Sequence, residues 1–157
     1  MIRKGIRFVS VITLSHLVTY YVAGVIAQVF LGAKEFYPPS PNAIVYLKDP
    51  HNPSLQMLIL PAQLLRGLLF GLVLLPLYPR FIKLGKWKGS FLVGAVILAI
   101  GYLAASGGLI EHVVYFKPEH YPIDFAIVTL VEIMIQTLLL SLSVLIFFRK
   151  EFAARGE

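Results

Sequence analysis

The sequence predicts an all-helical membrane protein with four transmembrane helices and both termini in the cytoplasm. Three observations predict it: an apolar composition, four long apolar runs, and basic residues that gather on one side of those runs. Of the 157 residues, 58% are hydrophobic and only 14% are charged, and the mean hydropathy is +0.80. Because a soluble domain carries about 25% charged residues, we expect much of the apolar surface to face lipid.

The four apolar runs cover residues 8–33, 55–79, 89–110 and 125–148. A bilayer core of about 30 Å needs about 20 helical residues, so each run is long enough to span it. The runs lack the alternation that is typical of membrane β-strands. The first run is also longer than the apolar part of a cleaved signal peptide, which has about 7–15 residues. We therefore expect one domain, residues 1–157, with four spans.

Lysine and arginine positions predict the orientation, because loops on the cytoplasmic side are enriched in both. Basic residues cluster before the first run, between the second and third runs, and after the fourth run: Arg3, Lys4, Arg7, Arg80, Lys83, Lys86, Lys88, Arg149, Lys150 and Arg155. With four spans, all three clusters fall on one side. The net charge of +6 is then a topology signal that requires no nucleic-acid partner, and its distribution predicts that both termini lie in the cytoplasm.

An internal repeat is predicted by sliding the chain along itself by 69 positions. Residues 44–53 then match residues 113–122 at five of ten positions, and the same offset places Gln63 on Glu132 and Arg80 on Arg149. The offset also superposes helix on helix and loop on loop. We interpret the chain as two parallel-repeated two-helix hairpins, related by a pseudo-twofold axis along the membrane normal.

Two charged residues, Arg66 and Glu132, lie inside the apolar runs. Charges within a span are costly and usually face other helices. Gln63 lies three residues before Arg66, and Gln136 lies four after Glu132, so each pair shares a helix face. We expect one polar cluster of these four residues. It is either a structural ion pair with two amides, or an ion, proton or anionic-ligand site.

Histidines supply two further candidates. His16 lies in the first span with Tyr20 four residues later on the same face, which fits either a proton relay or a packed, hydrogen-bonded histidine. A metal site on the outer rim is the second candidate, with His51, His112, His120, Glu111 and Glu119 as ligands. Their spacing matches no metal motif such as HExxH, so a polar interfacial loop is the alternative, and no cofactor is predicted.

Small residues recur with the spacing that lets membrane helices pack closely. Gly67 and Gly71 show it, as do Ala23 and Ala27. These faces pack either within the chain or against another subunit. The segment QLLRGLLFGLVLLP at residues 63–76 resembles a stretch of uncharacterised bacterial multi-pass membrane proteins. This resemblance implies a bacterial plasma membrane and brings no activity with it.

Enzyme motifs are missing from the sequence. We find no glycine-rich phosphate loop and no G-x-S-x-G elbow, so an enzyme is not the favoured interpretation. We expect an accessory or interaction subunit in the lipid bilayer, bound to another membrane protein or to copies of itself. The alternatives are a transporter or an ion- or proton-conducting unit that uses Arg66 and Glu132, and a metal-dependent membrane enzyme at the outer rim.

Overall fold

The computed structural model describes residues 2–41, 43–44, 52–103 and 122–153, and every regular element in these ranges is helical. The long helices are α1 (Ile2–Phe30), α2 (Pro53–Leu74), α4 (Lys86–Leu98) and α6 (Ile123–Phe147). Shorter elements join or extend them: the 3-10 helices η1 (Ala33–Phe36) and η2 (Leu75–Leu77), helices α3 (Tyr78–Lys83) and α7 (Arg149–Ala153), and the π-helical turn η3 (Ala99–Leu103).

Within the described residues, three helical segments are long and apolar enough to cross a membrane: Arg3–Phe30, Gln56–Lys83 and Ile123–Phe147. They confirm a helical fold suited to a membrane protein. The expected third span, residues 89–110, is described only as far as residue 103, as α4 followed by η3. Most of the repeated segments 44–53 and 113–122 lies outside the described residues. The fourth span and the repeat therefore stay predictions.

Capping residues and prolines set the limits of α2. The Asn52 side chain accepts a hydrogen bond from the backbone N–H of Ser54 at 3.0 Å, and Pro53 occupies the first turn, where a missing N–H costs nothing. At the other end, Pro76 and Pro79 lie in η2 and α3. Because proline interrupts the α-helical hydrogen-bond ladder, the predicted run 55–79 is divided into α2, η2 and α3. The chain then turns into α4.

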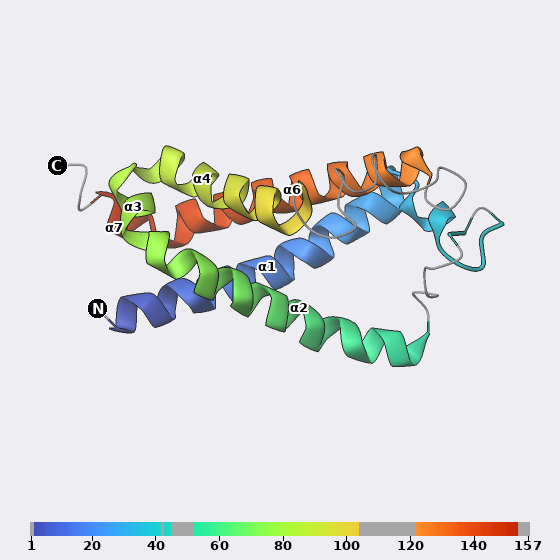
Figure 1. Cartoon of the computed structure of the whole chain (residues 1–157), viewed down its shortest axis with the longest axis horizontal. Helices are drawn as coiled ribbons and strands as arrows, with labels where there is room; N and C mark the ends of the chain where they lie inside the picture. The colour runs from blue at the N-terminus through green and yellow to red at the C-terminus, as the bar shows by residue number, and fades with distance from the viewer. Residues whose placement is uncertain (1, 42, 45–51, 104–121, 154–157) are drawn as a thin grey trace.

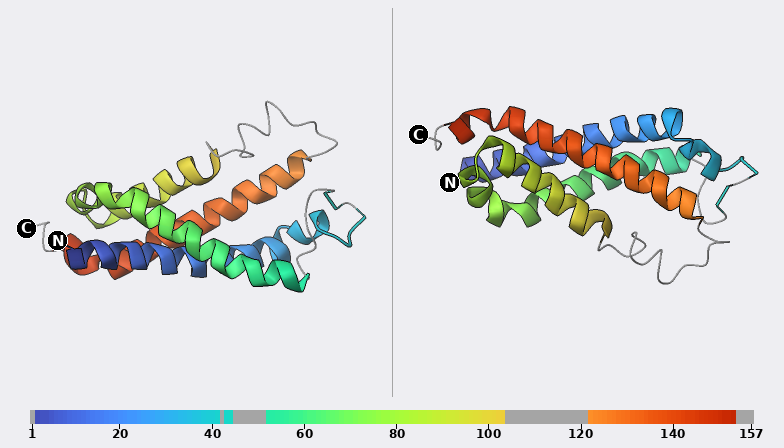
Figure 2. Two further views of the ribbon diagram at one scale, coloured as in Figure 1. Left: turned by 60° about the horizontal axis from the view of Figure 1, so that its bottom comes forward. Right: turned by 90° about the horizontal axis from the view of Figure 1, so that it is seen from above.

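Helix α1 is the central element, since it packs against both α2 and α6, while α4 packs against α6. Figure 1 shows both termini at the same end of the molecule, next to α3 and α7. We call this the terminal end and the opposite one the loop end. Figure 2 shows from the side how α2 crosses α1 and then diverges from it toward the loop end.

Glycines permit the closest helix approaches. A Cβ atom on Gly67 would lie 3.0 Å from the backbone of Thr13, and one on Gly71 would lie 3.0 Å from the Cα atom of Val9. The Gly67–Gly71 pair therefore packs within this chain, at the crossing of α2 on α1. Gly94 has the same role between α4 and α6, where an added Cβ would meet Thr137 and Ser141.

The apolar core fills the terminal end. Phe8, Tyr78 and Phe148 pack there at tilted or edge-on angles, with ring centroids 4.7–5.7 Å apart. The core continues through Ile12, Leu74, Val93, Leu140 and Val144. Over it, Arg7 donates a hydrogen bond to the carbonyl oxygen of Phe147 at 2.8 Å and forms an ion pair with Glu151.

The outer surface is apolar in turn. Met57, Phe30 and Ile146 are 79%, 76% and 66% exposed, and many leucines of α2 are exposed as well. A water-soluble protein rarely shows so large a continuous apolar surface. This surface is the one expected of helices that face lipid.

Candidate functional site

His16 is the centre of a hydrogen-bonded layer that joins three helices. Its imidazole is only 2% exposed. Nε2 lies 3.1 Å from Oε1 of Gln63 on α2, and Nδ1 lies 3.1 Å from Nε2 of Gln136 on α6. Because the Gln63 oxygen can only accept, His16 donates from Nε2; its Nδ1 then accepts from the Gln136 amide. A neutral imidazole therefore has a hydrogen-bond partner at each of its two ring nitrogens.

The His16 ring is also held by packing. It meets the Phe70 ring edge-on, with centroids 5.2 Å apart and planes at 84°. The ring of Tyr20, one turn further along α1, lies 6.5 Å away. His16 is thus fixed by α1, α2 and α6 together. Sequence reasoning placed both glutamines in one cluster and selected His16 separately, so it did not connect His16 with them.

Arg66 contacts the third apolar run rather than Glu132, which the sequence had left open as its partner. Its Nη2 donates to the carbonyl oxygen of Gly101 at 3.1 Å, and its guanidinium carbon lies 5.6 Å from the centroid of the Phe70 ring. Gly101 belongs to the π-helical turn η3, a type of turn that appears often at functional sites. Arg66 and His16 both line a cavity of about 10 Å³, the size of one water molecule.

Glu132 lines a much larger cleft. In the described part of the chain, neither an ion pair nor a hydrogen bond joins Glu132 to another side chain, so Arg66 and Glu132 do not form the ion pair that was one of the two alternatives. The cleft has a volume of about 750 Å³. Its walls come from the loop-end halves of α1 and α2, from η1 and from the segment after it: Tyr20, Tyr21, Gly24, Val25, Ala27, Gln28, Ala33, Lys34, Glu35, Tyr37, Pro38, Pro39, Ser40, Gln56 and Ile59.

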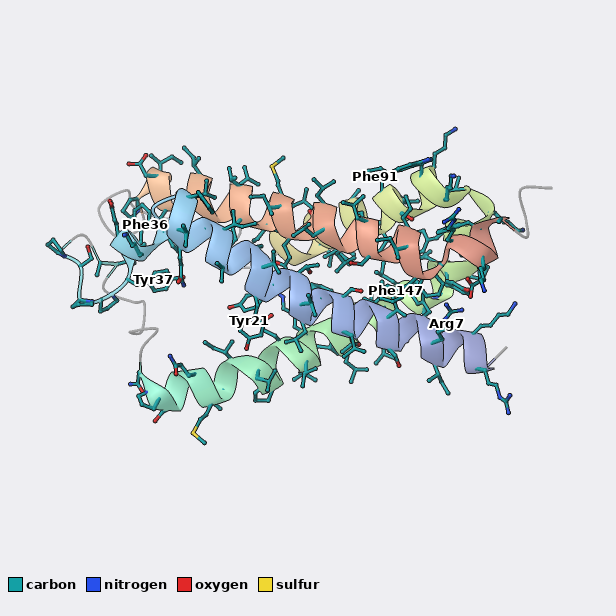
Figure 3. The ribbon with its side chains drawn as sticks, turned by 180° about the vertical axis from the view of Figure 1, so that it is seen from behind. Arg7, Tyr21, Phe36, Tyr37, Phe91 and Phe147 are labelled. Carbon is teal, nitrogen blue, oxygen red and sulfur yellow. The ribbon has the colours of Figure 1, made fainter. Side chains whose placement is uncertain are left out.

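Aromatic side chains shape the cleft. Tyr20 and Tyr21 have ring centroids 5.5 Å apart and planes at 76°. Figure 3 shows Tyr21 and Tyr37 in the space between α1 and α2. On the other side, Phe36 packs against Phe125 at 5.3 Å and fixes η1 to α6. The cleft is therefore bounded by elements that are themselves anchored.

Gly24 leaves the Glu132 carboxylate open to the cleft. A Cβ atom at this position would already lie 3.7 Å from Oε1 of Glu132, so a larger side chain would cover the carboxylate. Tyr20 lines the cleft and lies next to His16. Ile12 and Phe8, which come before His16 in α1, belong to the apolar core. The described cleft thus lies toward the loop end, and the His16 layer and the core lie between it and the terminal end.

The predicted metal site cannot be placed. His51, His112, His120, Glu111 and Glu119 all lie outside the described residues. Within ranges 2–41, 43–44, 52–103 and 122–153, no three His, Asp or Glu side chains gather into a metal-binding group. The outer metal site stays a prediction.

Comparison with protein-family models, with curated proteins and with solved structures finds no match to this chain. The resemblance of residues 63–76 to bacterial multi-pass proteins also stays a prediction. The function must be inferred from the chemistry of the cleft and of the layer beneath it.

Proposed function

We propose that this chain is a four-span protein of the plasma membrane that binds a small solute in a cleft open to the outer side and transports it. Both termini lie in the cytoplasm, and the loop end faces outward. One observation carries the proposal: Glu132, a carboxylate within a membrane-spanning helix, lines a cleft of about 750 Å³ and has no ion-pair partner among the described residues.

The size and lining of the cleft support solute binding. Ligand sites for small molecules have volumes of about 300–1,000 Å³ and combine apolar walls with a few polar groups. An unpaired charge in a span costs several kcal/mol, so such residues usually serve ions or substrates. Glu132 fits that rule, because nothing in its described surroundings neutralises it.

The basic residues support the orientation. Among the described residues, Arg3, Lys4, Arg7, Arg80, Lys83, Lys86, Lys88, Arg149 and Lys150 all belong to the segments of the terminal end. An excess of lysine and arginine favours the cytoplasmic side. The cleft at the opposite end would then open to the exterior, and the core of the terminal end would separate it from the cytoplasm.

Passage of a solute requires this closed half to open. Helix α2 contains Pro61, between the cleft residue Ile59 and the tight crossing at Gly67. Proline removes one helical hydrogen bond and is a common cause of helix bending. We propose that α2 bends there when the cleft changes its accessibility.

An accessory subunit remains the second candidate, supported by the same unpaired carboxylate. A lysine or arginine of a partner's helix would neutralise Glu132 as well as a solute would. Native mass spectrometry of the gently extracted protein separates the two proposals. A stoichiometric protein partner supports the accessory role, whereas a lone chain or homo-oligomer that retains a small molecule supports solute binding.

Cysteine labelling tests the cleft and its orientation, because the chain contains no cysteine. In intact cells we expect a membrane-impermeant maleimide to label Ile59→Cys, which lines the cleft. The adjacent Leu58→Cys is the matched control, since Leu58 is 61% exposed on the lipid-facing surface and lies outside the cleft lining. Labelling of Lys86→Cys should require permeabilised cells. Equal labelling at positions 58 and 59, or labelling of Lys86→Cys in intact cells, would refute the proposed site or its orientation.

Flux measurements test transport itself. Purified protein is reconstituted into vesicles that enclose a pH-sensitive dye, and a pH gradient is imposed with the small-molecule fraction of a cell extract outside. We expect faster decay of the gradient with wild-type protein than with Glu132→Gln. Asp124→Asn is the control, because Asp124 is an exposed carboxylate on the same helix outside the cleft lining. Equal decay for all three proteins contradicts the role of Glu132 in transport.

A further inference from the structure

The charge of the cleft favours a cation. Among the lining residues that the structure describes, only Lys34, Glu35 and Glu132 are charged. Lys34 and Glu35 are neighbours on η1 and are exposed, so their charges cancel at the rim and are screened by solvent. Glu132 therefore sets the sign of the interior. Arg66, which an anionic ligand would need, is absent from this lining and bonds to Gly101 instead.

The tyrosine rings provide a second kind of cation-binding surface. Tyr20 and Tyr21 both line the cleft, and the angle of 76° between their rings makes them two walls of a corner. The face of an aromatic ring attracts a cation, and aromatic corners are a common way to bind quaternary ammonium groups. Glu132 lines the same cleft, so charge and aromatic faces are available together.

The remaining walls of the cleft suit a bare metal ion poorly. Inorganic cations such as Ca²⁺ and Mg²⁺ need about six or more oxygen ligands at about 2.0–2.6 Å. A cleft of about 750 Å³ that includes Val25, Ile59, Pro38 and Pro39 is too wide and too apolar for that. These walls suit a ligand with an apolar body of its own.

We infer that the cleft binds a small organic monocation, whose ammonium group lies between Glu132 and the Tyr20–Tyr21 corner and whose apolar part lies against α2. The inference rests on the proposed function, because it names the class of solute that the cleft takes. It assigns Glu132 the charge contact, and it assigns the two tyrosines recognition of the ammonium group.

Equilibrium dialysis of the protein in lipid nanodiscs tests this inference, with radiolabelled benzyltrimethylammonium as the probe. We expect saturable binding of one ion per chain. The uncharged isostere neopentylbenzene, in which carbon replaces the ammonium nitrogen, should not compete, and neither should the benzenesulfonate anion. Glu132→Gln should weaken binding by about tenfold or more, since the cation loses the buried counter-charge that the described part of the lining supplies.

Matched variants separate recognition from loss of fold. Asp124→Asn, on the same helix, should bind as wild type does. Tyr21→Leu should weaken binding more than Tyr21→Phe, because phenylalanine keeps the aromatic face. Competition by neopentylbenzene equal to that of unlabelled cation overturns the inference, as does unchanged binding to Glu132→Gln. If Ile59→Cys is labelled but no cation binds, the inferred ligand class is wrong and the proposed cleft stands. If Ile59→Cys is not labelled, both the proposed cleft and the inferred ligand class are wrong.

Discussion

Gly94→Ala is expected to weaken the contact between α4 and α6. The new Cβ atom would overlap Oγ of Ser141 and lie 2.8 Å from the carbonyl oxygen of Thr137. Ser141 can rotate away, but it then gives up its 2.8 Å hydrogen bond to Thr137, worth about 1 kcal/mol. Overpacking against the backbone oxygen destabilises the fold further, by about 1–3 kcal/mol. The higher helix propensity of alanine offsets about 0.5–1 kcal/mol of this loss. We expect a net loss of about 1–3 kcal/mol.

Reversible unfolding by SDS in mixed micelles measures this free energy. Gly5→Ala is the matched control and should be neutral or slightly stabilising, because among the described residues Cβ on this α1 glycine would meet only side-chain atoms of Leu75, at 3.4 Å or more. Adding Ser141→Ala to Gly94→Ala removes the Oγ overlap and should recover about 1 kcal/mol in a double-mutant cycle. If Gly94→Ala proves as stable as Gly5→Ala, the close approach of α4 to α6 is wrong.

Three further substitutions test other parts of the packing in the same unfolding assay. His16→Ala leaves two glutamine side chains without their partner and opens a cavity, so we expect a loss of about 2–4 kcal/mol; the lipid-facing control Val18→Ala should lose less than about 1 kcal/mol. Ser90→Ala should be neutral or stabilising by up to about 1 kcal/mol, since the Ser90 hydroxyl is buried without a hydrogen-bond partner among the described residues; a large loss would show a missing contact. Glu151→Gln should cost no more than about 1 kcal/mol, because its ion-pair partner Arg7 is half exposed, and added salt should reduce this cost.

Much of the helical framework could be predicted from apolar run lengths. The predicted run 125–148 agrees with α6 to within two residues at each end. The run 8–33 begins later than α1, because Arg3, Lys4 and Arg7 are helical although they are not apolar. Hydropathy detects where a helix enters lipid, and it does not detect a helix that continues into water. The division of the run 55–79 into α2, η2 and α3 follows from Pro76 and Pro79, whose effect an apolar count overlooks.

The site was harder to predict, because spacing along one helix says nothing about the rotation of its neighbours. Gln63 and Arg66 share one region of α2, yet Gln63 bonds to His16 on α1 and Arg66 bonds to Gly101 in η3. The spacing of residues in the sequence does not indicate that the arginine would donate a hydrogen bond to a backbone carbonyl in a π-helical turn. The cleft was not predicted at all, since it depends on how far α2 diverges from α1 and on the path of the chain after η1.

The His16 layer has a consequence for biosynthesis. As the chain emerges from the ribosome, α1 and α2 are made first, and Gln63 is then present to meet one nitrogen of the imidazole. Gln136 is made more than seventy residues later, so the other nitrogen has no hydrogen-bond partner until α6 is inserted. A newly inserted first hairpin therefore carries an unmatched polar atom in the membrane, and arrival of α6 relieves it. The histidine that joins three helices in the folded protein is therefore an incompletely hydrogen-bonded group in the unfinished chain.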